Sequence, residues 1–182
     1  MNVDHSNELT KLKRIAIVGP ECTGKTSLAT QLASICKTTW VPEFARTFLE
    51  TLGRPYVASD LLDIAKGQVQ LEDNLALTAD HLLICDTNLL VIKIWSEFKY
   101  NTCDLWIREN TINRNYDLYF LTDIDMPWEA DPQRENPEQR EELFGLYKNA
   151  LDNMHVNYIV LSGNEEERLA KALAAIKKLQ ND

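Results

Sequence analysis

Short apolar runs alternate with longer amphipathic stretches along most of this chain. The apolar runs predict five strands, at Lys13–Val18, Thr39–Pro42, His81–Cys85, Asp117–Leu121 and Asn157–Leu161. Each run is apolar at nearly every position instead of alternating, which is typical of strands that are covered on both faces. Strands of this kind, separated by helices, indicate an α/β domain with a parallel sheet between two helical layers.

Between these strands, apolar side chains recur at helical spacing. Helices are therefore expected at Lys25–Cys36, from Pro42 to about Leu52, from Ser59 to about Ala79, from Thr87 to about Tyr100, from Asp104 to about Ile112, from about Glu138 to Met154, and over Glu165–Leu179. Ser59 is expected to cap the long helix that it precedes. The segment from Asp123 to Arg140 is polar and contains three prolines, so we expect a long functional loop there.

Length and composition indicate a single domain. The 182 residues suffice for one two-sided core, and we expect a flexible segment at residues 1–12 followed by one domain at residues 13–182. The N-terminal residues lack the apolar core of an export signal, and the longest apolar stretches are too short to span a bilayer. The expected compartment is the cytoplasm, with no membrane partner.

The charge balance excludes one class of partner. The formal net charge is −9, and no basic stripe is present, which argues against a nucleic-acid-binding protein. A nucleotide remains possible, because a phosphate site needs only local donors and a metal ion. The cysteines at 22, 36, 85 and 103 form no paired motif, so we expect neither a disulfide nor a structural metal site.

The most informative motif follows the first predicted strand. Residues 19–26 read GPECTGKT, which matches the phosphate-binding loop G-x-x-x-x-G-K-[ST] in full, with a strand before it and a helix after it. Glycines allow the backbone N–H groups to curl around phosphates, while Lys25 is expected to reach the β- and γ-phosphates and Thr26 to bind Mg²⁺. The expected ATP-binding residues are Gly19, Glu21, Cys22, Thr23, Gly24, Lys25, Thr26 and Ser27.

A carboxylate for the metal ion follows another predicted strand. Asp86 ends the apolar run LLICD, at the edge where ligands collect in a parallel sheet. An aspartate before a helix can also be a simple cap, but beside an intact phosphate loop the metal role is preferred. We therefore expect Thr26 and Asp86 to hold Mg²⁺.

Other residues point to a kinase among the phosphate-loop proteins. The chain has no Asn-Lys-x-Asp segment for guanine, and its histidines are too isolated for a nucleotidyltransferase site. A kinase needs a second carboxylate to receive the acceptor proton and cations that screen the transferred phosphoryl group. Glu43, in VPEFAR, can supply the first, although Asp86 could share that work. Arg134 and Arg140, in the long loop, can supply the second.

Candidate residues for binding the acceptor lie near these groups. Arg46 could contact the substrate or simply pair with a carboxylate. Trp40, Phe44, Trp95 and Trp128 could each stack on an aromatic ring, although each alone is more often a core residue. Trp128 is preferred because it lies in the polar loop and has the least reason to be buried.

Several blocks of sequence resemble one family. The pieces GPECTGKTSLA, VPEFAR, DIAKGQ, LLICDTNLLVIKIWSE, DLYFLTDIDMPWEADPQR and LSGNEEER are similar, in order from about Arg14 to Ala174, to the ribosylnicotinamide kinase domain of NadR-type proteins. The resemblance implies phosphorylation of nicotinamide riboside by ATP, giving nicotinamide mononucleotide. By positional analogy with related kinases, Gly163 and Asn164 would lie near adenine.

The resemblance also sets the expected topology and the alternatives. It implies a nucleoside-kinase-like sheet of order 2-3-1-4-5 with a lid loop. Adenylyl transfer and operator binding are not expected, because the chain has no room for those domains. Proline in Asp131-Pro132-Gln133-Arg134, where the family often has Asp-Gly, is expected to stiffen the lid. A kinase for another nucleoside or small alcohol, or a regulatory ATPase that binds a partner, remains the alternative, and the oligomeric state stays open.

Overall fold

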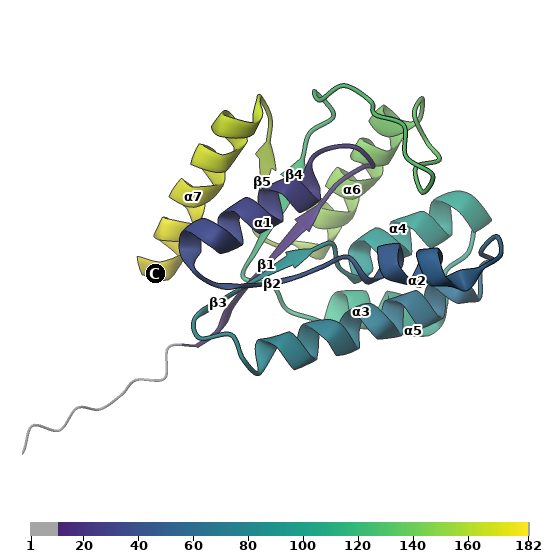
Figure 1. The fold of residues 1–182 in the computed structure, drawn as a ribbon, viewed down its shortest axis with the longest axis horizontal. Helices are drawn as coiled ribbons and strands as arrows, with labels where there is room; N and C mark the ends of the chain where they lie inside the picture. The colour runs from purple at the N-terminus through teal and green to yellow at the C-terminus, as the bar shows by residue number, and fades with distance from the viewer. Residues whose placement is uncertain (1–10, 182) are drawn as a thin grey trace, which may run out of the picture.

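A five-stranded sheet forms the centre of the molecule (Figure 1). The computed structural model describes residues 11–181. All four strand pairings are parallel, in the order β2-β3-β1-β4-β5, which confirms the predicted topology. The strands are β1 (Lys13–Val18), β2 (Thr39–Val41), β3 (Leu82–Asp86), β4 (Leu118–Thr122) and β5 (Tyr158–Leu161).

The helices lie within one to three residues of most predicted positions. They are α1 (Lys25–Cys36), α2 (Phe44–Leu52), α3 (Asp60–Ala76), α4 (Leu89–Tyr100), α5 (Leu105–Asn113), α6 (Arg140–Met154) and α7 (Glu165–Asn181). Helix α4 starts later than expected because Asn88 is its N-cap, with a side chain that accepts a hydrogen bond from the backbone N–H of Leu90 at 3.1 Å. Thr87 stands before the cap in a left-handed conformation, with φ of 70°.

The predicted N-cap position of α3 is confirmed, but without the hydrogen bond that a serine cap usually makes. Ser59 occupies the N-cap position, but its side chain makes no capping hydrogen bond. Asp60 orders this turn instead, since its carboxylate accepts from the backbone N–H of Val57 at 2.8 Å and binds Arg54 through two bonds of 2.8 Å. The first N–H groups of α3 donate to carbonyls of the preceding turn, since Asp60, Leu61 and Leu62 bond to Val57, Ala58 and Ser59.

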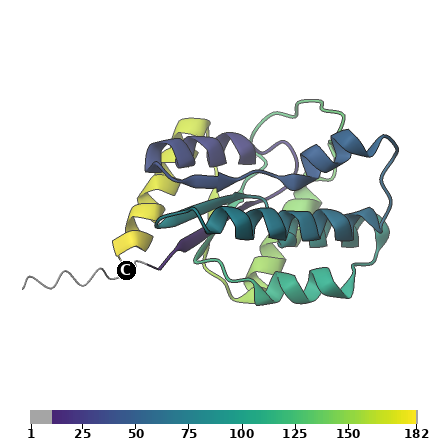
Figure 2. The ribbon, with the colours of Figure 1, turned by 60° about the horizontal axis from the view of Figure 1, so that its bottom comes forward.

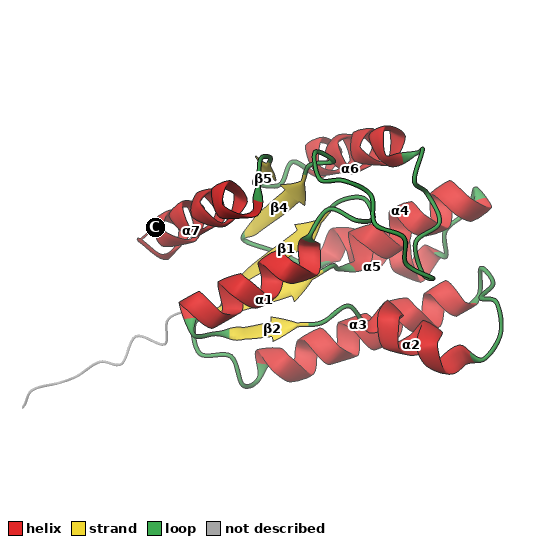
Figure 3. Cartoon of the chain, turned by 45° about the horizontal axis from the view of Figure 1, so that its top comes forward, coloured by secondary structure: helices red, strands yellow, loops and turns green. Residues whose placement is uncertain are grey.

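Helices cover both faces of the sheet (Figure 3). On one face α1 and α7 pack against Ile15 and Ile17 of β1, and on the other α4 and α6 pack against Ala16 and Val18. Helix α3 covers the same second face beside β2 and β3, and α2 and α5 lie against α3 and α4 (Figure 2). Alternate residues of β1 therefore enter two separate cores, which explains why the strand is apolar throughout.

The carboxyl ends of β1, β3 and β4 meet at one edge of the sheet. Ile17 pairs with Asp86, and Val18 with Leu121, so the loop after β1 emerges between the ends of β3 and β4. Gly19 has φ of 142°, and a Cβ atom there would lie 2.5 Å from the Thr122 hydroxyl oxygen. Only glycine allows this close approach, so the phosphate loop rests directly on the end of β4.

Within residues 11–181 the cysteines are all free, and Cys85 is buried in the sheet, where burial raises the pKa of its thiol. None of the described helices is both long and apolar enough to cross a membrane. The predicted flexible segment at residues 1–12 lies largely outside the described part of the chain. Of its last residues, Leu12 packs against the cluster that contains Val41 and Leu83.

Candidate active site

The phosphate loop leads directly into α1, and hydrogen bonds within the loop hold its shape. Gly24 occupies the N-cap position of α1 with φ of 76°, and the Thr23 hydroxyl donates to the Pro20 carbonyl at 2.8 Å. The Lys25 ammonium donates to the same carbonyl at 2.6 Å. Desolvation lowers the pKa of Lys25, and the negative charges of Glu43 and Asp86 counteract part of this shift. Lysine and both candidate carboxylates therefore lie in one electrostatic cluster.

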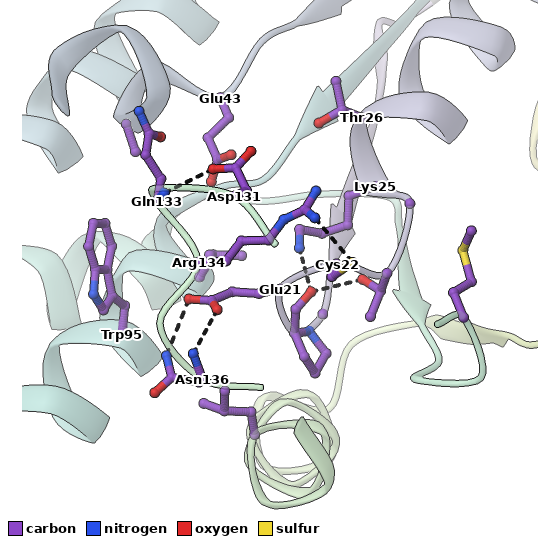
Figure 4. Close-up of a pocket in the computed structure, with 18 of the residues that line it drawn as sticks. Glu21, Cys22, Lys25, Thr26, Glu43, Trp95, Asp131, Gln133, Arg134 and Asn136 are labelled. Atoms are coloured by element: carbon purple, nitrogen blue, oxygen red, sulfur yellow. Dashed lines mark hydrogen bonds between the residues drawn. The ribbon is translucent and has the colours of Figure 1, made fainter. Parts of the chain in front are cut away.

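A cavity of about 540 Å³ extends from this loop (Figure 4). Its polar end contains the P-loop from Gly19 to Ser27, and its other walls come from α2, α4, α6 and the lid, which we define as residues 123–139. Apolar side chains from the three helices line the far part of the cavity: Leu49, Val91, Ile94, Trp95, Phe98 and Leu143. The combination of phosphate donors and an apolar, aromatic wall suits a small molecule placed against a nucleotide.

Glu43 lies in this cavity at the start of α2 (Figure 4). Its side chain makes no capping hydrogen bond to that helix, so the carboxylate is available to the cavity. Burial raises the pKa of Glu43, Lys25 lowers it, and the charge of Asp86 raises it further. A partly buried carboxylate with a raised pKa beside a lysine can accept a proton from a bound hydroxyl.

Asp86 fits the metal role better than the helix-cap role. It is 1% exposed, and within residues 11–181 neither of its carboxylate oxygens has a hydrogen-bond partner of good geometry. Burial raises the pKa of Asp86, whereas the nearby Thr26 hydroxyl and the Lys25 charge lower it. Asn88 already caps α4, so Asp86 is not needed there. A buried carboxylate without donors, next to a threonine hydroxyl, is the environment expected of a Mg²⁺ ligand.

The lid lies against the P-loop through Glu21. The Glu21 carboxylate accepts hydrogen bonds from the backbone N–H groups of Glu135 and Asn136 at 2.9 and 3.1 Å, and from the Asn136 amide at 3.2 Å. Arg134 donates to the Glu129 carbonyl at 2.5 Å and lies 3.2 Å from the Cys22 sulfur. Its charge also lowers the pKa of Lys25, which places both cations near the same point of the cavity. Glu21 and Cys22 therefore connect the P-loop to the lid.

Arg140 has a different environment from the catalytic one that we predicted. It does not line the cavity, and its guanidinium donates to the carbonyls of Met126, Ile124 and Cys22 at 3.0, 3.2 and 3.3 Å. A guanidinium occupied by backbone carbonyls shapes the lid and the P-loop instead of meeting a phosphoryl group. Of the two arginines, Arg134 alone lines the cavity among the described residues.

Of the four aromatic candidates, one lines the cavity and three lie elsewhere. Trp95 lines the cavity, while Trp40 packs in the core between the sheet and α1, and Phe44 packs against α3. Trp128, preferred on sequence grounds, lies outside the lining, and its ring centroid is 6.0 Å from the Arg140 guanidinium carbon. Arg140 bonds to the lid backbone at Met126 and Ile124, and its guanidinium thereby gives the Trp128 indole a cationic partner.

Two further placements concern Arg46 and the predicted adenine residues. Arg46 lines the cavity and binds Asp131 of the lid at 3.0 Å, so it pairs with a lid carboxylate and not with a helix. Gly163 and Asn164 do not line the cavity. Asn164 forms a capping box with Glu167, through bonds of 2.9 and 3.0 Å, and thus starts α7.

Several residues of the site were not among the predicted candidates. Asp131, Gln133, Asn136 and Tyr147 line the cavity, and only the first two lie in a block that resembles the family, DMPWEADPQR. Arg168, 3% exposed, donates to the carbonyls of Thr23 at 2.7 Å and Gly163 at 2.8 Å, and it pairs with Asp125. Arg168 ends the block LSGNEEER, and its place in a block that resembles the family was the available signal.

The chain is similar in sequence to known proteins. A family model described as "AAA domain" matches residues 14–168. The chain belongs to this family. The trifunctional NAD biosynthesis/regulator protein NadR of Escherichia coli (strain K12) is 24% identical over 179 residues, which cover 94% of this chain and 43% of that protein. NadR of Salmonella typhimurium is 25% identical over the same lengths. The chain thus spans less than half of these relatives, and the predicted resemblance is confirmed.

Solved structures agree on the fold. A NadR protein in complex with NR superposes with a TM-score of 0.79 at 17% identity, over 93% of this chain and 51% of that one. Thymidylate kinase from Ehrlichia chaffeensis gives a TM-score of 0.65 at 16% identity, over 92% and 98% of the two chains. Deoxyadenosine kinase from M. mycoides with bound dATP gives 0.60 at 12% identity, over 91% and 99%. The fold is that of P-loop kinases.

Proposed function

We propose that this protein transfers the γ-phosphoryl group of ATP to the 5′-hydroxyl of nicotinamide riboside. The observation that carries the proposal is the position of Glu43, a partly buried carboxylate in the same cavity as Lys25 and next to an apolar wall that includes Trp95. A P-loop protein that only hydrolyses ATP needs no such chamber beside its phosphate site. The likeness to NadR, including a structure in complex with NR, supports the choice of nucleoside.

The residues of the cavity divide the work of in-line transfer. The P-loop backbone and Lys25 hold the phosphates of ATP, and Arg134 screens charge on the transferred group from the lid. Glu43 orients the acceptor hydroxyl and takes its proton as the new P–O bond forms. Positioning and charge stabilisation account for most of the catalysis in such reactions, so little covalent chemistry is required of the protein.

Thr26 and Asp86 would hold Mg²⁺. The buried Asp86 oxygens lack partners within the described residues, and the Thr26 hydroxyl is close enough to lower the pKa of Asp86. When bound, Mg²⁺ neutralises charge on the β- and γ-phosphate oxygens. Asp86 then belongs to the metal, which leaves Glu43 as the base.

The charge of the acceptor suits the cavity. Nicotinamide riboside contains a pyridinium ring with a fixed positive charge, and an indole face such as that of Trp95 attracts cations. The carboxylates of Glu43 and Asp131 also line the cavity, although Asp131 is already paired with Arg46. A chain with a net charge of −9 does not repel a cationic substrate.

Two other functions use the same residues differently. A kinase for another nucleoside would keep Lys25, Glu43 and Arg134 but would not prefer a cationic ring. A regulatory ATPase would consume ATP slowly without an acceptor, and Glu43 would then have no role. The apolar wall of the cavity favours a kinase over a regulatory ATPase, and only the identity of the acceptor separates a nicotinamide riboside kinase from a kinase for another nucleoside.

A coupled assay of ATP consumption tests the proposal. Nicotinamide riboside should stimulate turnover well above uridine, cytidine, adenosine or thymidine, and the Lys25→Ala variant should show no stimulation. Equal rates with uridine and nicotinamide riboside would reject the substrate but keep the kinase. Absence of stimulation by every nucleoside would reject a nucleoside kinase as well.

A further inference from the structure

The lid has an anchor on the side opposite Glu21. The Glu135 carboxylate accepts from the Lys99 ammonium at 2.8 and 2.9 Å and from the Tyr56 hydroxyl at 2.6 Å. Lys99 belongs to α4, and Tyr56 lies in the segment that joins α2 to α3. Three separate parts of the chain therefore meet in what we name the Tyr56–Lys99–Glu135 cluster.

The cluster reaches the cavity through one side chain. The indole N–H of Trp95 donates to the Tyr56 hydroxyl oxygen at 3.0 Å, and the two rings meet edge-on with centroids 4.9 Å apart. Lys99 donates to the same oxygen at 2.5 Å. A phenol has one donor and two acceptor sites, and Tyr56 uses all three. Moving either Trp95 or Glu135 thus breaks a hydrogen bond of a fully occupied hydroxyl.

Burial and bonding keep the Tyr56 hydroxyl protonated. Burial and the bond to Glu135 raise the pKa of Tyr56 to about 12, so the hydroxyl remains a donor at neutral pH. The Lys99 nitrogen lies 4.0 Å from the Tyr56 ring centroid and 5.8 Å from that of Tyr100. Lys99 is therefore held between two aromatic faces and a carboxylate, which is more than an ordinary surface ion pair provides.

Residue 135 is consequently held from two directions. Its backbone N–H is bonded to Glu21 of the P-loop, and its side chain is bonded to Lys99 and to Tyr56, the hydrogen-bond partner of the cavity-lining Trp95. Arg134, the cation that lines the cavity, is the adjacent residue. Because the peptide backbone at 134 and 135 is continuous, the position of Glu135 determines where the Arg134 side chain starts.

We propose that Tyr56, Lys99 and Glu135 are positioning residues that couple the occupied acceptor site to Arg134. An acceptor ring stacked on Trp95 stabilises that indole, its bond to Tyr56, the bond from Tyr56 to Glu135, and thereby the arginine over the phosphates. Lid closure is then strongest when both substrates are present. This inference rests on the proposed acceptor site, but it does not depend on which nucleoside fills it.

Steady-state kinetics with the intact chain test the coupling. Glu135→Gln and Tyr56→Phe should each lower the acceptor-dependent kcat about five- to tenfold, whereas the KM for ATP should change less than about twofold. The double variant Lys99→Met/Glu135→Gln should be no slower than the slower of its two single variants, Lys99→Met and Glu135→Gln, because the residues act as one unit. Lys93→Met is the control, since Lys93 forms an ion pair with Glu97 within the same helix, at 2.7 Å, and should retain the wild-type kcat.

Amide hydrogen exchange supplies a second readout that needs no acceptor. The N–H groups of Glu135 and Asn136 should exchange faster in Glu135→Gln than in the wild type, and Lys93→Met should not change them. A fall in kcat without faster exchange, or faster exchange with an unchanged kcat, would overturn the coupling. If no nucleoside stimulates the wild type, the proposed function fails, and equal exchange rates in Glu135→Gln and wild type would then overturn the anchor independently.

Discussion

A buried carboxylate far from the phosphates offers a sharp test of what stabilises this fold. Glu72 of α3 has a side chain that is 1% exposed and accepts from Arg14 at 2.9 Å, Arg114 at 3.0 Å and the Tyr116 hydroxyl at 2.6 Å. Arg14 lies near the start of β1, whereas the P-loop follows its end. Glu72→Gln keeps the shape of the side chain but removes the charge that these donors share.

The size of the effect follows from the surroundings. Removing one partner of a buried ion pair costs about 3–5 kcal/mol. Here Asp73 still binds Arg114 at 2.6 Å, and Arg14 is 28% exposed, so water and Asp73 compensate in part. We therefore expect about 2–3 kcal/mol of lost stability by the same reasoning. For a chain of this size that lowers Tm by about 4–12 °C.

Urea denaturation of the wild type, Glu72→Gln and Asp73→Asn measures this loss. Asp73 is the matched control, because it binds the same arginine but its side chain is 51% exposed, so its loss should cost at most about 1 kcal/mol. Below its Tm, the Glu72→Gln enzyme should retain the kcat of the wild type. An equal loss for the two variants, or a reduced kcat in folded Glu72→Gln, would refute the reasoning.

Three further predictions concern the active site. Lys25→Ala should lower kcat by about a hundredfold or more without unfolding the protein, and a variant that keeps more than a few per cent of activity would contradict the P-loop assignment. Glu43→Gln should lower kcat by about a hundredfold or more and raise KM far less. Because burial raises the pKa of Glu43, activity should fall with decreasing pH through a value above the ordinary glutamate pKa of about 4.3, and the Gln variant should lack this acidic limb. Asp86→Asn should raise the Mg²⁺ concentration needed for half-maximal rate, and an unchanged requirement would assign Asp86 a purely structural role.

Local sequence predicted the parts of the site that depend on local geometry. The P-loop follows from its motif and from the strand and helix around it, and Asp86 follows from its position after an apolar strand. Parallel strands with helical connections bring such strand ends to one edge, so these residues could be placed together without a structure.

The lid could not be predicted in this way. Its conformation depends on contacts across more than a hundred residues, such as Glu21 with Asn136 and Arg140 with the Cys22 carbonyl. Two arginines in one polar loop look alike in sequence, yet Arg134 faces the cavity and Arg140 binds backbone. Trp128 was preferred as a substrate-binding residue because it lies in the polar loop. Its ring lies outside the cavity lining, 6.0 Å from the Arg140 guanidinium carbon, which gives it a partner elsewhere.

Arg140 and Arg168 also bear on how readily the phosphate loop binds ATP. The backbone N–H groups of a phosphate loop face the ligand, so its carbonyls must face away and find other donors. Arg140 supplies donors to the Cys22 carbonyl, and Arg168 to the Thr23 carbonyl, from the starts of α6 and α7. The loop therefore acquires its shape when the protein folds, and the entropy of ordering it is lost then and not at each encounter with nucleotide. The phosphate loop therefore already has its binding conformation before ATP arrives.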